Sequence, residues 1–315
     1  MRIASVSDLH LDHAANRELM PRLAQCIHDG GADLVVIAGD VSHRDEWIEK
    51  AVRAFSVAAP AVAFIPGNHD LWETPSPVDT WRRYRVHLRQ LVESAGGWYL
   101  PAAPWTRGDV AVAGTCGWYD HGFLLPPYRD LMSVERERTK QLGRHQWSDA
   151  KFVKFFAEDG RDMSDVEVTT IMIRELSEQL ETLQHNPAIS KVLVATHHLP
   201  FDEVVFRTGT LPWEFFNSFM GSPRIGEAML RYDKVRDIVY GHTHLGRDVT
   251  VSGRRVRGTP LGYPRERGSE SAEVTSNTRW DGGPVTASAR ITPVRFCRSS
   301  SCGRANDRRS RCSDR

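Results

Sequence analysis

The sequence lacks three features that would assign it quickly to a class of protein. No apolar run approaches the roughly 18 residues that cross a bilayer, so we expect no transmembrane helix and no membrane partner. There is no excess of one charge, because 41 Lys and Arg face 40 Asp and Glu and the formal net charge is +1. This balance gives no electrostatic reason to expect nucleic acid as a partner. The first residues also lack the apolar core of a signal peptide, since Asp8 and His10 interrupt them.

Cysteine is scarce as well. The chain has five cysteines in 315 residues, an odd number, and three of them fall in the last 20 positions. Such a set does not make a disulfide framework in a chain of this length. We therefore expect a reducing, cytoplasmic location.

Short apolar runs alternate with helical stripes in the first part of the chain. Strands are expected at 2–7, 33–38 and 62–65, and helices over 16–28 and about 47–58 lie between them. The order β-α-β-α-β implies parallel strands that are joined by helical crossovers. The sequence therefore predicts an α/β fold.

The same kind of pattern continues towards the C-terminus. Two helix starts stand out: Ser76-Pro77-Val78-Asp79 has proline at the first helical position, and Ser164-Asp165-Val166-Glu167 is a capping box. Further strands are expected at 110–113, 191–195 and 235–240, with a hairpin of 249–251 and 255–257 around Ser252-Gly253.

We expect one domain over residues 1–264, with a mostly helical insertion at about 120–162. The insertion is charged and weakly periodic, and eight Lys or Arg balance eight Asp or Glu between Arg129 and Asp165. Residues 265–315 are rich in Ser and Arg and poor in apolar residues, so they cannot bury enough surface to offset their ordering entropy. This tail is expected to be disordered.

Polar residues follow the predicted strands at the point where each strand ends. Ligands of open α/β sheets bind at the carboxyl ends of the strands, so these residues are expected to meet at one edge. The residues in question are Asp8 and His10, Asp40, Asn68, His69 and Asp70, His197 and His198, and His242 and His244.

Each fragment alone has a plainer explanation. Asp8 and His10 fit a helix cap with a surface histidine, Gly39-Asp40 fits a turn, and His197-His198 fits a buried, hydrogen-bonded pair. The histidines of Gly241-His242-Thr243-His244 are harder to dismiss, because two histidines spaced by two residues on an extended loop make a natural chelating pair. The five fragments in this order, each behind an apolar run, favour a shared site.

Taken together, Asp8-x-His10, Gly39-Asp40, Gly67-Asn68-His69-Asp70, the His197 motif and Gly241-His242-x-His244 resemble the signature of the calcineurin-like metallophosphoesterase superfamily. The resemblance implies a four-layer α/β/β/α sandwich and two divalent metal ions. It implies that Asp8, His10, Asp40 and His244 hold one ion, and that Asp40, Asn68, His197 and His242 hold the other.

The implied chemistry is hydrolysis of a small phosphomonoester or phosphodiester by a hydroxide that bridges the ions. Imidazole, carboxylate and amide ligands suit Mn²⁺ best here, with iron or Zn²⁺ as the other candidates. His69 is expected to stabilise the phosphoryl group and to protonate the leaving alkoxide. Asp70 is the candidate that orients His69, although it equally fits a role in fixing the turn.

One position departs from the family pattern. Many relatives carry Asp or Arg three residues after the second-block aspartate, where this chain has His43. Substrate contacts are expected from Asn68 and His69, from His198 beside the site, from Arg207 through its planar fork and from Trp72 by stacking. A packing role explains Trp72 and His198 equally well, and a single surface arginine is ordinary.

Other functions stay open at this point. A nuclease or a protein phosphatase of the same superfamily is an alternative, although the near-neutral sequence supplies no basic groove. A non-catalytic scaffold on the same fold is another alternative, but such proteins usually lose ligands that this chain retains. The physiological substrate and the oligomeric state do not follow from the sequence.

Overall fold

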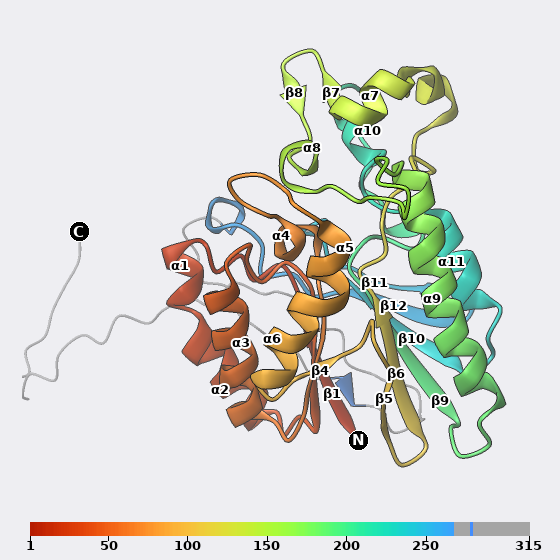
Figure 1. Cartoon of the computed structure of the whole chain (residues 1–315). Helices are drawn as coiled ribbons and strands as arrows, with labels where there is room; N and C mark the ends of the chain where they lie inside the picture. Colours follow the sequence, from red (N-terminus) through yellow and green to blue (C-terminus); the bar gives the residue numbers. More distant parts are fainter. Residues whose placement is uncertain (268–277, 280–315) are drawn as a thin grey trace, which may run out of the picture.

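Two β-sheets pack face to face, and helices cover the outer side of each sheet (Figure 1). The computed structural model describes residues 1–267 and 278–279. None of its helices is both long and apolar enough to cross a membrane.

The first sheet is built mainly from the N-terminal part of the chain. Its strand order is β13 (Thr278–Arg279), β1 (Arg2–Val6), β2 (Leu34–Ala38), β3 (Val62–Ile65) and β4 (Trp98–Tyr99). Strands β1 to β4 are parallel, as the alternation of strands and helices predicts, and β13 pairs antiparallel with β1. The outer face carries α2 (Met20–Asp29), α3 (Asp45–Ala58) and α6 (Leu88–Ser94) (Figure 1).

The second sheet has a parallel centre with antiparallel edges. Its strand order is β11 (Asp248–Val251), β12 (Arg254–Gly258), β10 (Val235–Tyr240), β9 (Lys191–Thr196), β6 (Val110–Thr115) and β5 (Trp105–Arg107). Strands β12, β10, β9 and β6 run parallel, and β11 and β5 close the two edges. Helices α9 (Asp165–His185) and α11 (Pro223–Leu230) cover its outer face (Figure 1).

Three apolar cores separate the four layers. In β2, Val35 and Ile37 pack towards the helices of the first sheet, whereas Val36 and Ala38 pack against the second sheet. Leu176 of α9 belongs to the third core, on the far side of the second sheet. A strand that is buried on both faces reads as a continuous apolar run, which is what the sequence shows. The predicted four-layer α/β/β/α sandwich is confirmed.

Two predicted helices begin elsewhere than expected. The helix predicted over 16–28 is divided into α1 (Ala14–Arg17) and α2, whose first turn contains Pro21, a residue without an N–H to donate. The start predicted at Pro77 is wrong. The helix begins at Thr80 in α5 (Thr80–Arg82), because the Asp79 carboxylate caps it by accepting the N–H of Arg82. The Ser164 capping box of α9 is confirmed.

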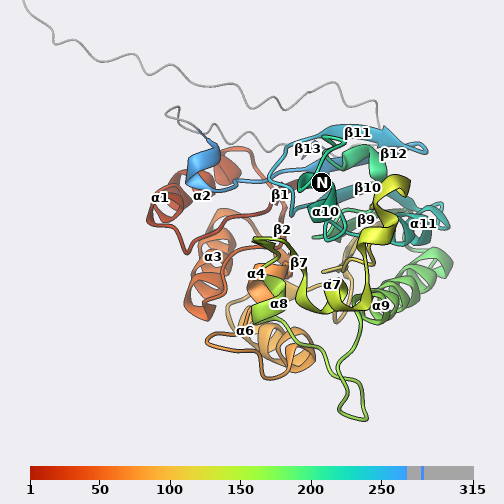
Figure 2. The same ribbon diagram turned by 90° about the horizontal axis from the view of Figure 1, so that it is seen from above.

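The insertion stands over the carboxyl ends of the strands, on the same side as α4 (Asn68–Leu71) (Figures 1 and 2). It is less helical than predicted, because a small hairpin interrupts it. Its elements are the 3₁₀ turn Pro126–Leu131, α7 (Val134–Thr139), β7 (Gln141–Leu142), β8 (His145–Gln146) and α8 (Asp149–Phe152).

Most of the segment predicted to be disordered, 265–315, lies outside the described residues. Within the described part, Pro264–Glu266 form a 3₁₀ turn, and Arg267 donates hydrogen bonds to the Leu261 and Gly262 carbonyls. Short α10 (Trp213–Asn217) and the turn Asp202–Val204 complete the connections around the second sheet.

Candidate metal centre

Five loops at the carboxyl ends of the strands bring the predicted ligands together. Asp8 and His10 follow β1, Asp40 follows β2 and Asn68 opens α4 directly after β3. From the second sheet, His197 follows β9, and His242 and His244 follow β10. Since the two sheets present these ends to the same edge, residues that are up to 236 positions apart become neighbours.

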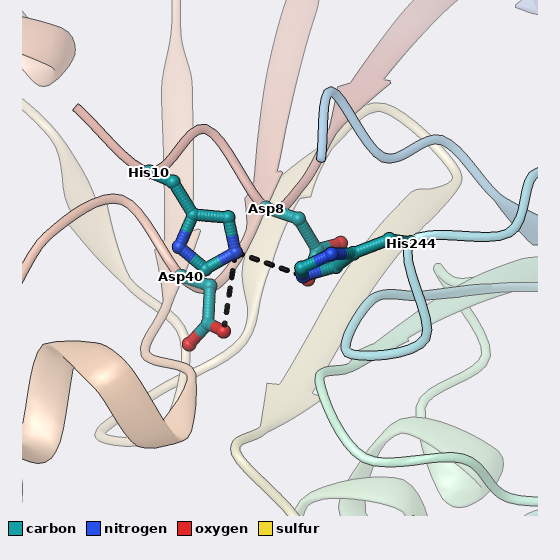
Figure 3. A group of neighbouring side chains, drawn as sticks. All are labelled: Asp8, His10, Asp40 and His244. Carbon is teal, nitrogen blue, oxygen red and sulfur yellow. Dashed lines mark hydrogen bonds and ion pairs between the residues drawn. The ribbon is translucent and has the colours of Figure 1, made fainter. Parts of the chain in front are cut away.

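One group consists of Asp8, His10, Asp40 and His244, whose ligand atoms lie within 4.8 Å of one another (Figure 3). His10 Nε2 lies 2.8 Å from His244 Nε2 and 3.9 Å from Asp40 Oδ2. His244 Nε2 lies 3.6 Å from Asp8 Oδ1. The other ring nitrogen of His244 is held by Glu266 Oε2 at 2.8 Å, the kind of carboxylate support that orients metal-ligating histidines.

A second group shares Asp40 with the first and adds His197 and His242. His197 Nε2 lies 3.3 Å from both Asp40 Oδ1 and Asn68 Oδ1, and 3.2 Å from His242 Nδ1. The remaining nitrogens of these rings face backbone carbonyls, His197 Nδ1 at 2.9 Å from Ala38 and His242 Nε2 at 3.2 Å from Phe219. The two groups therefore form one continuous cluster with Asp40 at its middle.

The backbone at these positions is unusual. In the described part of the chain, eight non-glycine residues have a positive φ, and five of them are Asp8, His10, Asp40, His242 and His244, with φ between 42° and 75°. Left-handed backbone costs free energy for residues with a Cβ, and it persists where the surrounding structure enforces it, often at functional sites. The fold holds these loops in a conformation that aims their side chains inward.

Two glycines of the motifs are required by close packing. A Cβ on Gly39, where φ is +87°, would lie 2.5 Å from His197 Nδ1. A Cβ on Gly67 would collide with Asp40 Oδ1. Neighbouring loops can approach closely enough to share the cluster because these positions carry no side chain.

Asp70 joins two of the loops through their backbones. Its carboxylate accepts the N–H groups of Asp40 and Gly67 at 2.8 Å and those of Val41 and Ser42 at 2.9 Å. Burial and the nearby Asp40 carboxylate raise the pKa of Asp70 to about 7, against the effect of the amides. Both oxygens of Asp70 accept from main-chain N–H groups, so the contacts of Asp70 match the role of fixing the turn.

Burial dominates the electrostatics of the histidines. It lowers the pKa of His10 and of His242, with the neighbouring histidines adding to the effect. It also lowers the pKa of His69, although the Asp40 and Asp149 carboxylates oppose it. Neutral imidazole is the form that binds a metal ion, so the burial of these rings favours coordination.

Asp40 and His197 form the charged pair of the cluster. Burial alone would lower the pKa of His197, but the Asp40 carboxylate outweighs it and raises that pKa to about 9. Burial would raise the pKa of Asp40, and His197, His69 and His10 together bring it well below its usual range. Burial raises the pKa of Asp8. Burial therefore disfavours the ionised form of Asp8, and a bound cation would offset that cost.

The donor set fits divalent metal ions. Among the described residues, Asp8 Oδ2 is buried without a hydrogen-bond partner, and such an atom is costly unless something binds it. The facing Nε2 atoms of His10 and His244 can share only one proton between them. Mixed nitrogen and oxygen donors suit Mn²⁺, iron or Zn²⁺.

His69 lies at the rim of the cluster. The backbone N–H of His69 donates to Asp40 Oδ1 at 2.9 Å. Its ring nitrogen Nε2 lies 3.9 Å from Asp40 Oδ2 and 3.4 Å from the Tyr263 hydroxyl. The ring stacks on Trp72 with the centroids 3.7 Å apart. Its side chain is 16% exposed, against 0–2% for Asp8, Asp40 and His197, so it faces the accessible side of the centre.

The other predicted substrate contacts lie as follows. His198 is buried with its ring centroid 4.4 Å from that of His242, and burial lowers its pKa to about 3. Arg207 pairs with Asp202 and with Glu214, and it donates to the Phe123 carbonyl. His43 lies 3.0 Å from Asp12. Of these three side chains, His198 is the one that packs against a predicted ligand.

Tyr263 is a site residue that was not singled out from the sequence. Its ring stacks on His10 with the centroids 4.3 Å apart, and it also contacts His69 and His244. Its segment is tied to the end of β1, because the Gly262 N–H donates to the Asp8 carbonyl. An apolar-aromatic segment after the last predicted strand was the only signal available for it.

A third group with ligand atoms in reach, His121, Glu137 and Asp165, lies in and beside the insertion. There the Lys140 ammonium already pairs with Asp165. The chain itself therefore already supplies one cation to this group.

Comparison with known proteins agrees with this geometry. The family model of calcineurin-like phosphoesterases matches residues 1–246. The chain is 26% identical over 271 residues to the acyl-carrier-protein phosphodiesterase PptH of Mycobacterium tuberculosis, covering 83% of this chain and 78% of that protein.

Solved structures give the same family of folds. The crystal structure of the phosphopantetheinyl hydrolase PptH from Mycobacterium tuberculosis superposes with a TM-score of 0.66 at 20% identity, covering 84% of this chain and 91% of that one. A dimetal phosphatase from Danio rerio superposes with a TM-score of 0.46 at 14% identity, covering 83% and 87%.

Proposed function

The chain belongs to the calcineurin-like phosphoesterase family, and on that basis we propose that it is a dinuclear metal-dependent phosphoesterase. The observation that carries the proposal is the single cluster around Asp40, in which two groups of candidate ligands share one carboxylate. We assign Asp8, His10, Asp40 and His244 to one divalent ion and Asp40, Asn68, His197 and His242 to the other.

Two bound divalent ions would acidify a water molecule and neutralise the charge of the phosphate oxygens. The chain's own residues then have distinct tasks. Asp40 sits between the two positions, with one oxygen towards His197 and the other towards His10. His244 and His242 approach from the second sheet, so the reaction site spans the junction of the two sheets.

His69 is the proposed proton donor to the leaving alkoxide. Its ring lies at the exposed side of the cluster, where a phosphate ester can approach. A bound phosphate group is negative and raises the proton affinity of an imidazole beside it, which offsets the burial of the ring. The Tyr263 hydroxyl, 3.4 Å from Nε2, helps to hold the ring in place.

Asp70 is proposed to serve this chemistry indirectly. Its four backbone hydrogen bonds set the path of the loops that carry Asp40 and Asn68, and its oxygens do not face the imidazole of His69. We therefore assign it a positioning role.

The proposed substrate is a phosphodiester. The curated relative is named a phosphodiesterase of acyl carrier protein, and its crystal structure is named a phosphopantetheinyl hydrolase. By extension we propose the phosphodiester that joins phosphopantetheine to a carrier protein as the substrate class for this chain. The Trp72 ring already stacks on His69 and contacts Phe152, so we do not assign Trp72 to stacking on a substrate.

The test uses purified protein that has been stripped by chelation and reloaded with Mn²⁺. Bis(p-nitrophenyl) phosphate and p-nitrophenyl phosphate compare a diester with a monoester, and mass spectrometry of a phosphopantetheinylated carrier protein follows loss of its prosthetic group. We expect turnover that depends on Mn²⁺ and favours the diesters. Absence of turnover with Mn²⁺, Co²⁺, Zn²⁺ and Fe²⁺ would contradict a hydrolytic function.

A further inference from the structure

Asp149 is a fully buried carboxylate in the insertion, at the first residue of α8. Four side chains donate hydrogen bonds to it: Asn68 and Trp72 to Oδ1, and Tyr119 and Trp147 to Oδ2, all at 2.7–3.0 Å. Buried carboxylates are expensive unless they are fully hydrogen-bonded, so this arrangement has a structural cost that its partners offset.

The contact with Asn68 determines which way its amide points. Asn68 Nδ2 donates to Asp149 Oδ1 at 2.9 Å. A carboxylate that accepts from four donors can receive only the NH₂ end of an amide, so the carbonyl oxygen of Asn68 must face the other way. There, Asn68 Oδ1 lies 3.3 Å from His197 Nε2, inside the cluster. Asp149 therefore turns the only amide of the candidate ligand set into a correctly oriented oxygen donor.

The contact with Trp72 reaches His69. Trp72 Nε1 donates to the same Asp149 oxygen at 2.7 Å, and the indole stacks on the His69 ring and contacts Phe152. Position 43, where many relatives carry Asp or Arg, is a histidine that lies 3.0 Å from Asp12, so this position offers His69 no carboxylate. A stacked ring that is itself anchored by Asp149 is a different way to hold the imidazole.

The other carboxylate oxygen of Asp149 connects the insertion to the part of the cluster that comes from the second sheet. Tyr119, which follows β6, donates to Oδ2 at 3.0 Å, and Trp147 donates to it at 2.8 Å. The Trp147 ring also lies against His242, with the centroids 5.6 Å apart. One carboxylate thus connects groups that touch ligands from both sheets.

We propose that Asp149 is a positioning residue that orients Asn68 towards the second metal position and, through Trp72, holds the imidazole of His69. The proposal rests on the proposed function, because it assumes that Asn68 is a ligand and that His69 is the proton donor. If Asp149 has this role, the insertion helps to position residues of the metal centre, in addition to any role in covering it.

Three variants test it. Asp149→Ala removes both acceptor oxygens and with them all four hydrogen bonds. Asp149→Asn keeps one oxygen for Asn68 and Trp72 but turns an NH₂ towards the donors of Tyr119 and Trp147, so it serves as a partial rescue. Asp165→Ala is the matched control, because Asp165 is also a buried aspartate that accepts an indole N–H, from Trp118 at 2.8 Å, and anchors the insertion through Lys140.

The main readout is the affinity of the stripped proteins for Mn²⁺. It is measured by calorimetric titration well below their unfolding temperatures. For Asp149→Ala we expect the second ion to bind about 10–100-fold more weakly, the usual effect of losing a group that supports a ligand. The first ion should bind as in the parent protein. Asp149→Asn should recover part of the affinity, and Asp165→Ala should keep both affinities.

Kinetics at saturating Mn²⁺ provide the second readout. We expect kcat of Asp149→Ala on the diester to stay lowered while KM changes little, because His69 has lost its support. Equal Mn²⁺ affinities in Asp149→Ala and the parent, or equal losses in Asp149→Ala and Asp165→Ala, would overturn the proposal. A parent protein that binds fewer than two ions or shows no turnover would instead overturn the proposed function.

Trp72→Phe covers the case in which Asp149→Ala does not fold. This variant keeps an aromatic ring, although a smaller one, at position 72 and removes the indole N–H that donates to Asp149. We expect kcat to fall several-fold with unchanged Mn²⁺ affinities. An unchanged kcat would contradict the link from Asp149 to His69.

Discussion

The strand-end loops of the sandwich and the insertion meet at the same cluster, but they contribute in different ways. The loops supply the candidate ligands, on backbones that are left-handed at Asp8, His10, Asp40, His242 and His244. The insertion supplies no candidate ligand of this cluster. It is built from short elements, and it contacts the cluster through one buried carboxylate and the aromatic rings around it.

The difference shows how a site can divide two tasks. Ligand identity is fixed by the sheets, because the strand ends place these loops side by side and glycines at positions 39 and 67 allow them to pack closely. Ligand orientation depends on a segment outside the sandwich. Changes to the ligands on the loops should therefore remove metal ions, and changes to the insertion should weaken or misalign a centre that still forms.

The largest effect is expected from Asp40→Ala. Asp40 is common to both groups of ligands, so we expect loss of both ions and turnover at the uncatalysed background. Elemental analysis after dialysis against Mn²⁺ measures the metal content. His43→Ala is the control in the same loop, since its imidazole contacts Asp12 and none of the proposed ligands. If Asp40→Ala retained two ions, the assignment of metal binding to the strand-end loops would be contradicted.

His69→Ala should separate metal binding from catalysis. We expect both ions to remain and kcat to fall by ~10²–10⁴-fold, the range typical for loss of a general acid. Stopped assays on the diester, with metal content measured on the same sample, test this. If the variant empties the cluster, His69 is a ligand and the assigned roles are wrong.

Asp70→Asn should act on the stability of the loops. An amide cannot accept from all four backbone N–H groups, and leaving buried donors without an acceptor costs about 2–4 kcal/mol in total. Urea unfolding of the metal-free protein measures the loss. A difference below about 0.5 kcal/mol would mean that the loops do not depend on this carboxylate, since surface substitutions stay within that range.

The smallest effect is expected from Glu167→Gln, in a regular helix away from the cluster. Hydrogen bonds from Arg161 and Ser164 lower the pKa of Glu167 to about 2, from a usual value near 4.5. A carboxylate whose pKa is lower in the folded state stabilises the fold at pH values above its pKa in the unfolded state. This stabilisation is lost as the pH falls through its pKa in the folded state. Because the side chain is 38% exposed and solvent screens its ion pair, we expect a loss of about 0.5 kcal/mol or less at pH 7.

Unfolding at several pH values tests the sign of this effect. The difference between Glu167→Gln and the parent should shrink as the pH falls from about 4.5 towards 2. A difference that grows in acid would contradict the assigned pKa shift. Mn²⁺ affinity should not change, because Glu167 lies outside the cluster.

The sandwich was largely predictable from the sequence, because strands buried on both faces appear as continuous apolar runs such as 33–38. The approach of Asp8 and His244 was also predictable, since both follow strands whose carboxyl ends share an edge. The structure brings the seven predicted ligands into one cluster, and what they bind remains a proposal. The start of α5 was missed because Asp79 was read as a first-turn acid, although its side chain is the cap.

The supporting residues could not be found in the same way. Asp149 is one of eight acidic residues in the insertion segment, and nothing in their spacing shows which of them is buried. Its importance depends on tertiary contacts with Asn68, Trp72 and Tyr119, which lie 30 to 81 positions away. Tyr263 was indicated only as part of the segment after the last predicted strand, because its partners His10 and His244 come from other loops.

The most direct test of the account is the anomalous scattering of manganese in crystals of the protein grown with Mn²⁺. The account predicts two peaks, one on each side of Asp40, with Asn68 Oδ1 among the ligands of the second. A single peak, or peaks away from Asp40, would contradict it.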